Sequence, residues 1–71
     1  MRYGKWILCE DELPEVDDEF LVTWTCKDCK RPFLAMLEFS QGEGWIIEKY
    51  MLSYKDVKVV AWMPLPDAYK G

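Results

Sequence analysis

Apolar residues alternate with polar ones in four segments of this 71-residue chain. An alternation with a period of two residues is typical of strands, whose successive side chains point to opposite faces. We therefore expect strands at residues 20–25, 33–39, 45–48 and 57–63. Joined in sequence order, they form an antiparallel meander. The chain is predicted to be a mainly β fold, or a small α+β fold, in a single domain of residues 1–71.

The segments between these strands indicate the connections. Residues 26–32 fit a long hairpin loop, and residues 40–44 contain two glycines, which suit a tight turn. Residues 49–56 fit either one helical turn or a loop that crosses a face of the sheet. Before the first strand, residues 6–8 fit a short edge strand or a docking arm, and residues 15–19 fit a solvated turn.

The positions opposite the main alternation are also apolar. They are Leu21, Leu34, Met36, Ile46, Val60 and Trp62. A single open sheet would leave one apolar face in water. We therefore expect the N-terminal arm, residues 6–14, and the proline-rich tail, residues 64–69, to pack over one face, or the sheet to curl into a small barrel.

Aromatic rings and prolines are the expected anchors of so short a chain. It contains four tryptophans, four tyrosines and three phenylalanines, and each buried ring removes about 150 to 250 Å² of surface from water. We expect most of these rings to be structural. The predicted anchors are Trp6, Leu13, Pro14, Trp24, Trp45, Trp62, Pro64 and Pro66.

Charge is distributed unevenly along the chain. Thirteen acidic and nine basic residues give a net charge of −4, and more than half of the acids lie within residues 10–19. This balance argues against general binding to nucleic-acid phosphates, which requires clustered lysine and arginine. The acidic segment fits a solvated face, or a mimic of nucleic acid that enters a basic groove. The candidate binding residues are Asp17, Asp18, Glu19, Lys27, Lys30 and Arg31.

The three cysteines suit a reducing compartment with free thiols, because their number is odd. Cys26 and Cys29 form a C-x-x-C pair, which is how half of a structural zinc site is often built. Cys9 is the third thiol, and there is no histidine, so a full site needs a carboxylate or a second chain. A redox role is a further alternative, but the α/β setting of thioredoxin-like pairs is missing. We expect free loop thiols.

Catalytic chemistry has little support in the residue set. Without histidine, a general base near neutral pH would have to be a strongly perturbed carboxylate, lysine or cysteine. Gly42-Glu43-Gly44 lacks the lysine and the strand-to-helix setting of a phosphate loop. We expect a protein that is not an enzyme and needs no cofactor. Because no apolar run is long enough for a membrane span, we also expect a cytoplasmic protein.

Two motifs resemble a known family. Residues 6–15 read W-I-x-x-x-D-x-L-P-E, and residues 62–66 read W-M-P-L-P. They resemble the opening and closing motifs of domain of unknown function 551, a family of small phage and prophage proteins, and the resemblance extends from residue 6 to residue 66. It implies an origin in a phage or prophage and no particular activity. The departures are Ala61, where the family often has histidine, and a shortened proline-rich ending at residues 66–68.

These observations favour a non-catalytic binding module that recognises a host or phage macromolecule in the bacterial cytoplasm. We expect a protein partner, with a nucleotide as the alternative ligand, and neither nucleic acid nor a membrane. The alternative functions are a counter-defence protein, which inhibits a host nuclease or sequesters a nucleotide signal, and a zinc-stapled structural domain. Both motifs are also compatible with a purely structural role. The sequence leaves the oligomeric state open.

Overall fold

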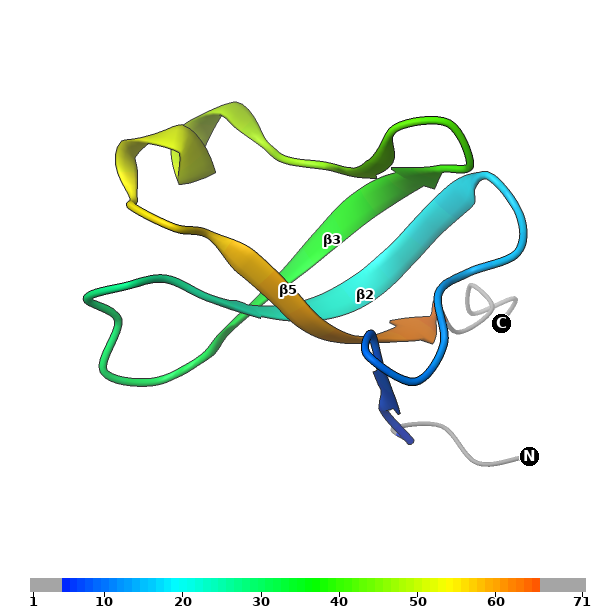
Figure 1. Ribbon diagram of the computed structural model, residues 1–71, viewed down its shortest axis with the longest axis horizontal. Helices are drawn as coiled ribbons and strands as arrows, with labels where there is room; N and C mark the ends of the chain where they lie inside the picture. The colour runs from blue at the N-terminus through cyan, green and yellow to red at the C-terminus, as the bar shows by residue number, and fades with distance from the viewer. Residues whose placement is uncertain (1–4, 66–71) are drawn as a thin grey trace, which may run out of the picture.

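The computed structural model describes residues 5–65 of the chain. Five strands form one open antiparallel sheet in the order β1-β5-β2-β3-β4 (Figure 1). They are β1 (Ile7–Leu8), β2 (Asp18–Thr25), β3 (Phe33–Ser40), β4 (Gly44–Ile46) and β5 (Lys58–Pro64), and a 3-10 helix, η1 (Lys49–Ser53), precedes β5. The prediction of a mainly β fold is confirmed. The expected meander holds for β2, β3 and β4, but the last strand, β5, pairs with β2 and not with β4. The outer strands β1 and β4 do not pair, so the sheet does not close into a barrel.

The hairpin of β2 and β3 is the centre of the fold. Its register runs without interruption from Asp18 opposite Phe39 to Trp24 opposite Phe33. The predicted alternation is confirmed, because every second residue of β2 from Phe20 onward is buried. The buried core consists of Phe20, Val22, Trp24, Leu37, Phe39, Met51, Val59 and Trp62.

A bulge in β5 corrects the predicted faces of the last strand. The register of β2 against β5 shifts at Trp24, which leaves Val60 without a partner residue on β2. One extra residue moves the alternation by one position. Val59 and Trp62 therefore both lie in the core. The prediction that Trp62 faces away from the main apolar side is wrong for this reason.

The N-terminal arm lies along the edge of the sheet. Ile7 pairs with Trp62 of β5, which confirms the edge-strand interpretation of residues 6–8. The indole Nε1 of Trp62 donates a hydrogen bond of 2.8 Å to the carbonyl oxygen of Glu12, and Pro14 is buried. The arm therefore extends the sheet beside β5 at residues 7–8, and its Glu12 carbonyl contacts the side chain of the core residue Trp62. Most of the predicted tail lies outside the described residues.

The cover over the core comes from the connection between β4 and β5. Residues 47–57 cross the core face from β4, at one side of the sheet, to β5, near the other (Figure 1). Met51 of η1 is fully buried, at 0% exposure, whereas its neighbours Tyr50 and Leu52 are exposed. Both interpretations of this segment are thus confirmed, because it contains a helical turn and crosses a face of the sheet. No helix within residues 5–65 is long and apolar enough to cross a membrane.

The predicted anchors fall into three groups. Pro14, Trp24 and Trp62 are buried, and Trp45 is half-buried against the core. Trp6, Leu13 and Pro64 are exposed and do not anchor the core. Trp6 and Leu13 flank the short edge strand β1, and Pro64 is the last residue of β5. Pro66 lies outside the described residues.

The face opposite the core is apolar and open along β3. Leu34 and Met36 are 63% and 53% exposed on this face. Leu21 and Ile46 are half-buried. Within residues 5–65 neither the arm nor the β4–β5 connection covers these side chains, since the arm lies beside β5 and the connection lies on the core face.

Candidate functional site

The acidic candidates lie where the chain enters β2. Asp17 Oδ1 accepts a hydrogen bond of 2.8 Å from the backbone N–H of Gln41. Asp18 Oδ1 accepts one of 2.7 Å from the N–H of Glu19. Gln41 Nε2 also donates to the carbonyl oxygen of Pro14, at 3.0 Å. Asp17 therefore helps to hold the β3–β4 turn against the segment that precedes β2, which is a structural role.

The basic candidates lie at the other end of β2. Lys27, Lys30 and Arg31 are exposed in the β2–β3 loop, residues 26–32. The eight residues of β2 separate them from the acids by about 23 Å. Figure 1 shows the two connections at opposite ends of the molecule. The structure therefore divides the predicted binding residues between two distant surfaces.

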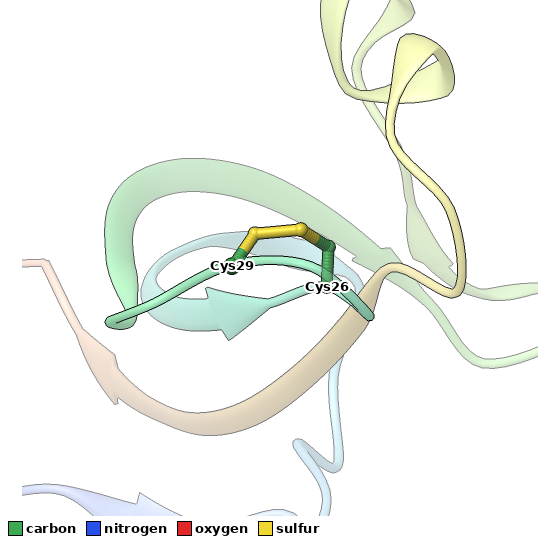
Figure 2. Close-up of a disulfide and its surroundings, with 2 residues drawn as sticks. All are labelled: Cys26 and Cys29. Atoms are coloured by element: carbon green, nitrogen blue, oxygen red, sulfur yellow. A yellow bond between two sulfur atoms is a disulfide. The ribbon is translucent and has the colours of Figure 1, made fainter.

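Cys26 and Cys29 form a disulfide in the β2–β3 loop (Figure 2). The N–H of Cys29 donates to the carbonyl oxygen of Cys26 at 3.3 Å. This turn brings the two Cα atoms to 5.1 Å, within the usual range for disulfides. The expectation of free loop thiols is corrected accordingly. No group of three or more side chains that ligate metals is present in residues 5–65, so Cys9 does not join the pair in a zinc site.

Removing this disulfide is expected to lower the free energy of unfolding by about 2 kcal/mol, because so short a closed loop restricts the unfolded chain only modestly. Thermal melting of a Cys26→Ser/Cys29→Ser variant beside the native protein measures the loss. Alkylation of the denatured protein counts its thiols. We expect one modified cysteine without reductant and three with it. Three modified cysteines without reductant would show that the pair is reduced.

Cys9 is the free cysteine of the described residues, and it packs against the core. Burial raises the pKa of the Cys9 thiol, while the Trp45 side chain and the charge of Lys58 act in the opposite direction. The buried Trp45 Nε1 has no hydrogen-bond partner within residues 5–65, so it forms no full hydrogen bond with the sulfur. Cys9 is therefore protonated at neutral pH and is a poor nucleophile.

Three exposed aromatic side chains surround the buried Trp24 at the basic end of the molecule. The ring centroids of Phe33, Tyr54 and Tyr50 lie 5.1, 5.4 and 6.5 Å from that of Trp24. Trp24 is 3% exposed, whereas Phe33, Tyr50 and Tyr54 are 39%, 56% and 45% exposed. We call Phe33, Tyr50 and Tyr54, with Trp24 as their floor, the aromatic patch. It is the candidate functional site.

Two contacts hold the aromatic patch in shape. The buried Met51 fixes η1, and the N–H of Lys27 donates a hydrogen bond of 2.8 Å to the carbonyl oxygen of Lys55, just after η1. Figure 1 shows η1 and the β2–β3 loop at the same end of the molecule. The charged residues next to the patch in sequence are the bases Lys27, Lys30, Arg31, Lys49 and Lys55 and the acids Asp28, Glu48 and Asp56. Among these sequence neighbours, bases outnumber acids by five to three.

The sequence did not identify the aromatic patch because its rings were expected to be structural. A useful signal was present in residues 49–55. Tyr50 and Tyr54 are four residues apart and Met51 lies between them. In a helical turn, such spacing places both tyrosines near one another. The sequence does not show that this turn lies over Trp24.

A shallow hollow of about 210 Å³ lies at the other side of the sheet, beside β1. It is lined by Leu8, Glu10, Lys58 and Val60. Drug-sized and cofactor-sized ligands usually occupy pockets of about 300 to 1,000 Å³. This hollow is smaller and contains none of the rings of the aromatic patch, so it does not offer a nucleotide an aromatic wall to stack on.

Comparison with known proteins gives one match. A family model described as "Protein of unknown function (DUF551)" matches residues 5–69. Neither the curated proteins nor the solved structures contain a match. The matched region includes all five strands and the aromatic patch.

Proposed function

Since the chain belongs to the DUF551 family, whose description assigns no function, we propose a function from its own surface: a non-catalytic binding module that recognises a partner protein through the aromatic patch. One observation carries this proposal, the exposure of Phe33, Tyr50 and Tyr54 around a buried Trp24. Exposed aromatic rings offer a large contact area at low entropy cost and are enriched at the centres of protein interfaces.

The surroundings of the aromatic patch favour a protein segment that carries negative charge. The excess of lysine and arginine among its sequence neighbours complements acidic side chains and speeds their association. The indole Nε1 of Trp24 is buried without an acceptor among residues 5–65.

The resemblance to phage and prophage proteins adds an expectation about the source of the partner. We propose that it is a host or phage macromolecule, present in the same cell as this chain. A nucleotide is less well supported, because the hollow beside β1 is small and has no aromatic lining. A binding module of this kind can inhibit a host enzyme. Identification of the partner decides whether this chain does so.

The test compares three immobilised proteins in a bacterial lysate: the native chain, a Tyr50→Ala/Tyr54→Ala variant and a Val16→Ala control. Val16 is an exposed apolar residue, 59% accessible, in the arm-to-β2 connection and away from the patch. We expect one protein to be retained by the native chain and the control, and to bind at least about tenfold more weakly to the double variant.

Mass spectrometry of the eluates identifies proteins and nucleotides together. Equal retention of the captured protein by all three chains would contradict recognition through the aromatic patch. A nucleotide that co-elutes with the native chain and is lost from the double variant would favour the sequestration alternative. Circular dichroism of the double variant checks that its fold is intact, as expected for two exposed side chains.

A further inference from the structure

The outer edge of β3 is unpaired over residues 33–37. On its inner side β3 pairs with β2 along this whole stretch. On its outer side β4 pairs only with Glu38, Phe39 and Ser40. Apart from the ladder with β2, no backbone hydrogen bond within residues 5–65 reaches residues 33–37. An edge of this kind presents N–H and C=O groups that can pair with another extended chain.

This edge lacks the features that usually protect strand edges from pairing. Residues 33–37 include no charge and no proline, and their register against β2 shows no bulge. On the open face of the sheet, Leu34 and Met36 are 63% and 53% exposed. The unpaired backbone and the exposed apolar side chains therefore coincide.

We propose that a second copy of this chain pairs with the edge of β3, antiparallel and with two-fold symmetry, so that Ala35 lies opposite Ala35 of the other copy. The free stretch ends at Pro32, which has no N–H, and at Glu38, which β4 already covers. Its midpoint is Ala35, so this register alone pairs all of residues 33–37. It places Leu34 of each copy opposite Met36 of the other. The same surface of both copies therefore forms the interface, as two-fold symmetry requires.

Charge at the two ends of the stretch supports this choice of partner. Glu19 and Glu38 lie directly opposite each other on β2 and β3, and like charges in that position destabilise a sheet. In the proposed register, the paired stretch of one copy ends at Pro32, next to Glu38 of the other copy, whose outer side β4 occupies. The basic residues just before Pro32, Lys30 and Arg31, then come beside this acidic pair. The two-fold axis brings the same basic and acidic residues together at the other end of the interface.

The test measures the association of the full chain by sedimentation equilibrium. We expect a reversible dimer for the native protein. Two double variants put like charges opposite each other across the two-fold axis. They are Leu34→Glu/Met36→Glu and Leu34→Lys/Met36→Lys. Each is expected to weaken the dimer at least about tenfold. An equimolar mixture of the two puts opposite charges across the axis and is expected to restore association. A Val16→Lys variant adds a charge at an exposed apolar position that lies beyond the other end of β3 from residues 33–37, and its dimer should match the native one.

Three results would overturn the proposal. A native chain that is monomeric up to millimolar concentration excludes the dimer. A dimer that survives both double variants uses another surface, and two variants that do not associate when mixed do not share the proposed register. Because Leu34 and Met36 are exposed, both variants should keep the native circular dichroism spectrum.

Discussion

Replacing Trp62 with alanine is expected to remove a large share of the chain's free energy of unfolding. Trp62 is 6% exposed in the core, and its ring meets Phe20 edge to face at 5.1 Å. Truncating a buried tryptophan costs about 3 to 5 kcal/mol. A chain of this length has about 4 to 11 kcal/mol of stability in total. Urea unfolding, followed by far-ultraviolet circular dichroism, measures the loss.

A Trp62→Phe variant separates packing from hydrogen bonding at the same position. It keeps an aromatic ring in the core and removes the indole N–H that bonds to the carbonyl oxygen of Glu12. We expect a smaller loss, about 1 to 2 kcal/mol. A native melting temperature for the alanine variant would show that Trp62 is not a core residue.

The second large effect is expected from Met51→Ala, at about 2 to 5 kcal/mol. Met51 is the buried residue of η1, and its side chain joins that helix to the core. Losing it removes the main apolar contact that positions Tyr50 and Tyr54 over Trp24. Chemical unfolding measures the stability, and binding of the captured partner measures the effect on the aromatic patch.

Leu52→Ala is the matched control, because Leu52 is the next residue of η1 and is 71% exposed. We expect its stability to stay within about 0.5 kcal/mol of the native value. Equal losses for the two variants would show that η1 is not anchored through Met51. If Met51→Ala folds but no longer binds the partner, η1 positions the recognition surface.

The central hairpin could be predicted from the sequence, and the faces of β5 could not. In β2 the period-two pattern alone assigns Phe20, Val22 and Trp24 to the core, because the strand is regular along its length. In β5 the single unpaired residue Val60 reverses the pattern halfway. Such a bulge depends on the pairing of two strands, and no residue type in the run Val59-Val60-Ala61 marks it.

The candidate site was less predictable because it is assembled from distant segments. Charge identified Lys27, Lys30 and Arg31, which lie near the aromatic patch, but it also grouped them with acids at the far end of β2. Phe33, Tyr50 and Tyr54 meet only because Met51 enters the core beneath η1. That contact is tertiary and leaves no local pattern in the sequence. The disulfide was missed because an odd number of cysteines says nothing about which two meet.

The strand order also has a consequence for how the protein is made. The central strand β2 has β3 on one side and β5 on the other, and about thirty residues separate the end of β2 from the start of β5. During synthesis the β2–β3 hairpin leaves the ribosome while the edge of β2 that later pairs with β5 is still unpaired. The core is completed only when β5 emerges, and contacts so distant in sequence form slowly. A nascent chain halted before β5 should therefore be the form most open to proteases and to aggregation.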